Sequence, residues 1–126
     1  MSTTPFFRGY ENFDARLNSL ASLKDGWLNG EGTGISEQTV QNAKLVLKAI
    51  FENSSIQIPR PTIGPTEEGG IDIQWTNIFC TILPSNELEV WIKNIQTTET
   101  TTYNISSEME KIVNHVQKSL FKEQTD

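Results

Sequence analysis

The feature that most constrains the fold is a turn that leads directly into an alternating strand, in residues 65–75. The turn contains Pro65 and the pair Gly69-Gly70, and glycine accepts the backbone conformations of tight turns without strain. From Ile71 to Trp75, apolar and polar residues then alternate, which is the pattern of a strand with one buried side. The chain therefore contains a sheet that is packed on one face.

More strand candidates surround this segment. Residues 78–83 and 87–94 follow it, and short turns that suit hairpins separate the three segments. Residues 78–83 are apolar on both sides, which predicts a central strand. The threonine-rich residues 96–102 predict a further strand, because β-branched side chains fit a pleated surface. Prolines surround Ile63, so it is expected on an edge strand or outside the sheet.

Three segments have helical spacing. Residues 10–23 carry apolar side chains at helical intervals, and Ser36 is a suitable N-cap for a second helix that ends by residue 53. Ser107 and Glu110 are spaced like a capping box that would begin a final helix. Residues 1–9 have no such pattern and are expected to form a loose N-terminal arm.

These elements predict a single α+β domain over residues 1–126. It has two N-terminal helices, then an antiparallel β meander of four to five strands, then a C-terminal helix packed on one sheet face. A chain of this length can bury a core of its own without metals or disulfides.

Charge and cysteine content limit the function classes. The formal net charge is -6, so a protein that binds nucleic acid or an anionic membrane through a basic face is not expected. Cys80 is the one cysteine, which excludes an intrachain disulfide and fits a reducing compartment. No segment approaches the roughly 18 apolar residues of a membrane span, so a soluble, cytoplasmic protein is expected.

No constellation of residues predicts a reaction centre. His115 is the one histidine and has no cysteine or aspartate near it in sequence, so we interpret it as a surface or boundary residue. Cys80 lies in an apolar strand, where burial would make it inert. The segment Gly30–Gly34 before a helix is similar to a phosphate-binding loop but lacks its lysine and preceding strand. No catalytic, metal-binding or cofactor-binding residue is assigned.

Tryptophan is the residue that best indicates an interaction surface. Trp75 shares a side with Ile71 and is expected in the core. Trp91 lies opposite the apolar side of its strand, so it either anchors a partner or packs under a loop. Trp91, its strand neighbours Glu89 and Lys93, and the loop residue Trp27 form the predicted partner-binding set.

Two motif-bearing segments resemble a group of small bacterial proteins. The matching residues are Leu20, Leu23, Asp25-Gly26-Trp27, Asn29-Gly30, Ile35-Ser36, Pro59, Pro61, Pro65-Thr66, Gly69-Gly70-Ile71, Ile73 and Trp75. The group's pattern is GWDGYGA…IS, then a helix, then PTPDGGI.LEW, and the likeness covers residues 17–93. The chain departs from it at Leu28, Glu67 and Gln74, where the pattern has Asp, Pro and Glu. The resemblance implies a fold and no activity, and it implies a setting near mobile elements or toxin and defence genes.

The sequence predicts a non-catalytic protein-binding or regulatory subunit, for example an antitoxin-like or defence-associated one. An acidic chain would suit a basic protein partner, and a homo-oligomer stays open. One alternative is a small-ligand or nucleotide sensor that uses the Gly30–Gly34 loop. Another is an enzyme that uses the carboxylates of Asp72, Glu87 or Glu89.

Overall fold

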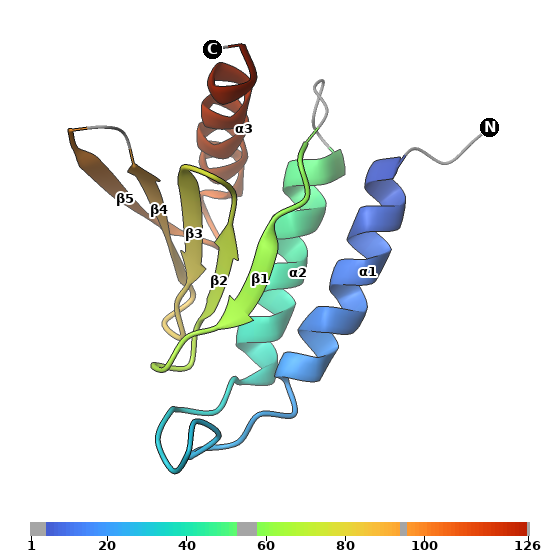
Figure 1. The fold of residues 1–126 in the computed structure, drawn as a ribbon, viewed down its shortest axis with the longest axis vertical. Coiled ribbons are helices and arrows are strands. Elements are labelled where there is room, and N and C mark those ends of the chain that lie inside the picture. The colour runs from blue at the N-terminus through green and yellow to red at the C-terminus, as the bar shows by residue number, and fades with distance from the viewer. Residues whose placement is uncertain (1–4, 53–57, 94–95, 126) are drawn as a thin grey trace.

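The computed structural model describes residues 5–52, 58–93 and 96–125. In chain order, the elements are α1 (Pro5–Leu20), α2 (Glu37–Glu52), β1 (Thr62–Pro65), β2 (Ile71–Gln74), β3 (Ile78–Ile82), β4 (Glu87–Lys93), β5 (Thr98–Asn104) and α3 (Met109–Thr125). The five strands form one antiparallel sheet in the order β1-β2-β3-β4-β5, with the helices on one side of it (Figure 1). The α+β class is therefore confirmed, and β3 is the central strand, as expected.

Three expectations about the helices need correction. Helix α1 begins at Pro5, so the part of the expected loose arm from Pro5 onward is helical, whereas residues 1–4 lie outside the described residues. Helix α2 begins at Glu37, directly after the predicted N-cap Ser36, whose hydroxyl accepts a hydrogen bond of 3.1 Å from the Thr39 N–H, but it lies further along the chain, so there is one N-terminal helix and one mid-chain helix. The expected capping box of Ser107 and Glu110 is also wrong, as described next.

Glu108 occupies the N-cap position of α3, which the sequence pattern assigned to Ser107. The Glu108 carboxylate accepts a hydrogen bond of 2.8 Å from the Asn104 N–H, and the Glu108 N–H donates to the Asn104 carbonyl oxygen at 2.9 Å. The Glu108 carbonyl oxygen accepts from the Ile112 N–H, as the first helical bond does. The pKa of Glu108 is lowered, because the Asn104 N–H and then the Lys111 ammonium stabilise its charged form.

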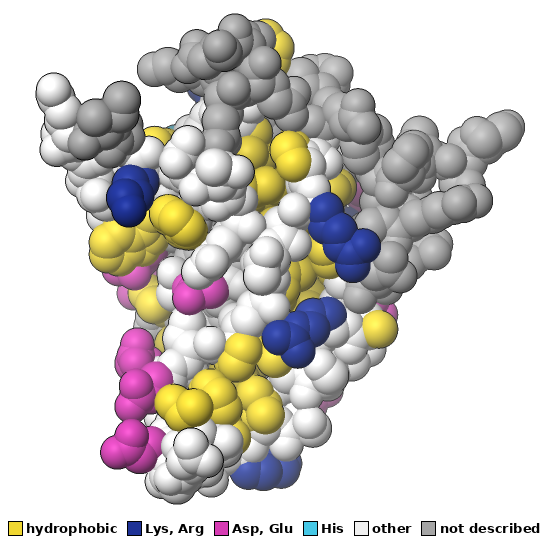
Figure 2. Space-filling model, in the orientation of Figure 1, with side chains coloured by type: hydrophobic (Ala, Val, Ile, Leu, Met, Phe, Trp, Pro, Cys, Tyr) yellow, Lys and Arg dark blue, Asp and Glu magenta, His cyan; other side chains and the backbone are white. Residues whose placement is uncertain are grey.

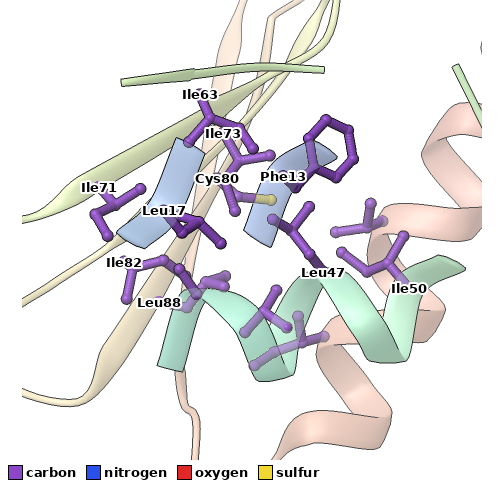
Figure 3. Packing of buried hydrophobic residues seen from close by; sticks show 14 of the residues in the cluster. Phe13, Leu17, Leu47, Ile50, Ile63, Ile71, Ile73, Cys80, Ile82 and Leu88 are labelled. Carbon is purple, nitrogen blue, oxygen red and sulfur yellow. The ribbon is translucent and has the colours of Figure 1, made fainter. Parts of the chain in front are cut away.

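The core lies between the helices and one face of the sheet (Figure 3). Adjacent strands contribute Ile73, Cys80 and Val90 in one row of the register, and all three side chains are fully buried. Leu17 of α1 and Leu47 of α2 cover this row from the helix side. Burying one such side chain stabilises the folded chain by about 1.5–3 kcal/mol, so this face determines the fold.

Residues in two turns of the sheet form hydrogen bonds to distant parts of the chain, in one case to helix α2. Asn42 of α2 is buried, donates to the Asn86 side chain at 2.8 Å and accepts from Gln38 at 3.0 Å. Asn86 lies in the β3–β4 turn with a left-handed backbone, φ 67°, which asparagine tolerates better than most residues. Trp75 is buried as expected, and its indole N–H donates to the Pro59 carbonyl oxygen at 2.8 Å.

Candidate functional site

Within residues 5–52, 58–93 and 96–125, no helix lies on the second face of the sheet. Side chains alternate across an antiparallel sheet, so each strand that contributes a core residue also presents its neighbours to the other side. The outward-facing residues are Thr62, Asp72, Gln74, Phe79, Thr81, Glu87, Glu89, Trp91, Lys93, Thr98, Thr100 and Thr102. This uncovered face is mostly polar, so its apolar members are the informative ones.

Two aromatic side chains lie next to each other on the uncovered face of the neighbouring strands β3 and β4. Phe79 of β3 and Trp91 of β4 are directly opposite in the register, with Gln74 and Thr100 as the next residues in the same row. Trp91 keeps 37 % of its surface exposed, and Phe79 is half-buried. In proteins, an exposed tryptophan beside a second aromatic ring is typical of an interaction surface.

Charged groups flank this aromatic pair. Glu89 and Lys93 lie two residues to either side of Trp91, so their side chains project from the same face of β4. We call Phe79, Glu89, Trp91 and Lys93 the Trp91 patch. In Figure 2, hydrophobic side chains gather beside a basic one on the β4–β5 side of the sheet, and acidic side chains line the same edge below them. The structure thus brings together three of the four predicted partner-binding residues.

Phe79 belongs to the patch but was not predicted there. Its strand is apolar on both sides, and that pattern predicted a central strand without indicating which of the two faces is covered. The strand is central in the sheet, yet only the face of Ile78, Cys80 and Ile82 is covered. The signal that could have found Phe79 is the hairpin register, which pairs it with Trp91 across the turn at Pro84.

Trp27, the fourth predicted residue, lies away from the patch. Its indole N–H donates to the Thr33 carbonyl oxygen at 2.7 Å, and its ring leaves no room for a Cβ at Gly32. The Thr33 N–H in turn donates to the Glu67 backbone carbonyl oxygen at 2.7 Å, in the turn before β2. The row of Trp91 instead passes through Gln74 at the other end of β2. Trp27 therefore stabilises its own loop. This loop, between α1 and α2, lies at the opposite end of the sheet (Figure 1).

The glycine-rich loop uses its N–H groups internally. The Gly26 N–H donates to Gly32, the Gly30 N–H to Gly26, and the Gly34 N–H to the Asp25 carboxylate at 2.8 Å. A phosphate cradle needs such groups free and pointing at the ligand. This geometry does not favour a nucleotide sensor at this loop.

Two of the three candidate carboxylates, Asp72 and Glu89, share a row on the uncovered face, whereas Glu87 lies two residues before Glu89 on β4. Asp72 accepts a hydrogen bond of 2.8 Å from the Thr81 hydroxyl, and Thr81 lies opposite Glu89. The two carboxylates are therefore separated by a strand, with their backbones roughly 10 Å apart. Within the described part of the chain, no group of three or more His, Cys, Asp or Glu side chains could hold a metal ion.

Histidine and cysteine both lie on the covered side. The Tyr103 hydroxyl and His115 Nδ1 are hydrogen-bonded at 2.8 Å, and the two rings meet edge to face. Burial lowers the pKa of the half-buried His115, and the charge of Glu99 partly opposes this. Cys80 is fully buried, and burial raises the pKa of its thiol to about 12. A thiol in this state is not a nucleophile at neutral pH.

Comparisons with protein-family models, with curated proteins and with solved structures find no match. Among the residues that the structure describes, no helix is both long and apolar enough to cross a membrane. The functional assignment therefore depends on the geometry of the uncovered face.

Proposed function

We propose that the chain is a non-catalytic protein-binding subunit that contacts its partner through the Trp91 patch. The observation that carries this proposal is the pairing of Trp91 with Phe79 on a sheet face that no helix covers. When a partly exposed tryptophan packs against a partner, a large apolar area is removed from water, and little side-chain entropy is lost.

The charges around the patch specify the kind of partner. Asp72, Glu87 and Glu89 project from the same face, and Lys93 is the basic residue next to Trp91. With a net charge of -6 on the chain, this surface would attract a basic protein and accelerate its association at low ionic strength. A regulatory subunit that masks a nucleic-acid-handling protein, as an antitoxin-like or defence-associated protein does, fits these requirements.

The test compares four forms of the full chain as baits in an extract of the native host. Trp91→Ala removes the proposed anchor, and Leu45→Ala is the matched control, because Leu45 is 54 % exposed on α2, on the helix side. We expect a protein that wild type and Leu45→Ala retain and that Trp91→Ala loses. For the purified partner, the dissociation constant should rise about 30-fold or more with Trp91→Ala.

Trp27→Ala is the fourth bait and separates the loop from the patch. Because Trp27 bonds within its own loop, its removal should leave partner binding within about threefold of wild type. Equal retention of every captured protein by all four baits would contradict the proposal. So would a partner whose affinity rises with salt, since an acidic surface on a basic partner binds more weakly in salt.

A further inference from the structure

The two edges of the sheet differ in how accessible their backbones are. Strand β1 is four residues long, follows Pro61 and ends at Pro65, and the Ile63 carbonyl oxygen accepts a hydrogen bond of 3.1 Å from Arg16 Nε. Strand β5 is seven residues long, contains no proline and has Glu99 as its one charged side chain. In Figure 1, no other element lies beyond β5. An open edge of this kind is a template for another strand.

The hydrogen bonds at the end of β5 identify the backbone groups that face outward. The Ile105 N–H donates to Asn86 on the β4 side, whereas both backbone groups of Asn104 bond to Glu108 instead of β4. Backbone groups of successive residues alternate between the two sides of an antiparallel strand. Thr100 and Thr102 therefore direct their N–H and carbonyl groups away from β4, and within the described residues these outward groups have no partner.

We propose that β5 pairs antiparallel with β5 of a second copy of this chain, centred on Thr101, to form one continuous ten-stranded sheet. In this register, Thr100 of each copy lies opposite Thr102 of the other, and the two pairs exchange four backbone hydrogen bonds. The pairing ends at Asn104, whose outward groups already bond to Glu108. The pair of Thr100 and Thr102 thus maps onto itself under a two-fold axis through Thr101, as an isologous dimer requires.

The side chains support the same register. Glu99 lies opposite Tyr103 of the second copy rather than opposite its own equivalent, so no like charges face each other across the new pair. On the uncovered face, Lys93, Thr98 and then Asn104 and Glu87 of the second copy occupy one row, because Lys93 pairs with Thr98 and Glu87 pairs with Asn104 within each chain. Lys93 of one copy and Glu87 of the other thus lie at opposite ends of this row, and their charges are opposite. The threonines that meet at the centre are β-branched and suit cross-strand packing.

The dimer does not depend on the proposed function, because Trp91 lies on β4 and takes no part in the new pairing. Sedimentation equilibrium of the full chain over a wide concentration range tests the dimer directly. We expect the mass of two chains at high concentration, with association that strengthens in salt because each chain carries a charge of -6. The mass of a single chain at every concentration would overturn the proposal.

Thr100→Pro tests the edge itself. Proline removes an outward N–H and is tolerated at a sheet edge, so the chain should keep its fold, as circular dichroism can verify. The dimer dissociation constant should rise about tenfold or more, because each copy loses a hydrogen-bond donor at the pairing. Thr100→Val keeps the N–H and should dimerise like wild type. A wild-type dimer in Thr100→Pro would overturn the proposal.

A pair of double variants tests the register without altering the backbone. Thr100→Lys with Thr102→Lys places like charges opposite each other twice, whereas Thr100→Glu with Thr102→Lys places opposite charges there. Both positions are exposed, so neither variant should disturb the fold. We expect the first to be monomeric and the second to dimerise, and equal dimerisation of both would overturn the pairing. Trp91→Ala should dimerise like wild type, so the dimer and the partner site can fail independently.

Discussion

The two faces of the sheet are built from the same strands, but one is buried and apolar, whereas the other is exposed and mostly polar. On the covered face, Ile73 and Cys80 are fully buried in the core, and they form one continuous apolar row with Val90. In the adjacent row of the register, the side chains point to the uncovered face, and Phe79 and Trp91 lie there among polar side chains. The covered face determines the fold, and the uncovered face is free to determine what the chain binds.

The largest expected effect separates the faces at two adjacent residues of β2. Ile73→Ala should lower the free energy of unfolding by about 2–5 kcal/mol, because it leaves a cavity in the core. Gln74→Ala, on the exposed side of the same strand, should change it by no more than about 0.5 kcal/mol. Urea unfolding of both variants provides the comparison. Similar losses for the two would mean that the uncovered face also holds the fold together.

A second prediction concerns Asn42, one of the two polar residues that are buried in the described part of the chain. Asn42→Ala removes a buried amide that bonds to both Gln38 and Asn86, and should cost about 1–3 kcal/mol of unfolding free energy. Gln38→Ala removes one of these bonds from an exposed position and should cost less. Urea unfolding distinguishes them, and an Asn42→Ala cost as small as that of Gln38→Ala would show that the α2 link to the β3–β4 turn is not needed.

Strand alternation is the part of this contrast that the sequence could predict. The exposure of Trp91 follows from its position opposite the apolar side of β4, and the edge position of Ile63 follows from its neighbouring prolines. Both are local consequences of backbone geometry. The place of Phe79 was missed because it depends on which face the helices cover, and that is a tertiary property.

Residues that act through a single hydrogen bond were the hardest to predict. The bond from Trp27 to Thr33 lies within a loop with several left-handed residues, whose path no periodicity encodes. The N-cap position of α3 was assigned to Ser107, because Ser107 and Glu110 have the spacing of a capping box, whereas the helix begins one residue later, at Met109.

A third prediction examines whether the aromatic pair on the uncovered face is a stabilising contact as well as a binding surface. In a double-mutant cycle with Phe79→Ala and Trp91→Ala, we expect a coupling of about 0.2–1 kcal/mol in unfolding free energy, as for other cross-strand pairs. Thr81→Ala with Trp91→Ala is the control, because Thr81 faces Glu89 instead. A coupling no larger than that control would mean that the two rings are held apart.

The smallest expected effect lies where the covered face ends, at β5. Burial lowers the pKa of His115 in the folded chain below the 6.5 of an unfolded one. As the pH falls through 6.5, the unfolded chain takes up a proton first, so the free energy of unfolding decreases until the folded pKa is passed. His115→Gln should remove this loss, as urea unfolding at a series of pH values can show.

Glu99→Gln sharpens the same measurement. The Glu99 carboxylate raises the pKa of His115 and so opposes the effect of burial, which means that its removal should extend the loss to lower pH. The lowered pKa of Glu108 acts in a separate window, below 4.5, because that carboxylate is charged in both states above it. A pH profile that Glu99→Gln leaves unchanged would mean that solvent screens the Glu99 charge from the imidazole of His115, so that burial alone sets the shift.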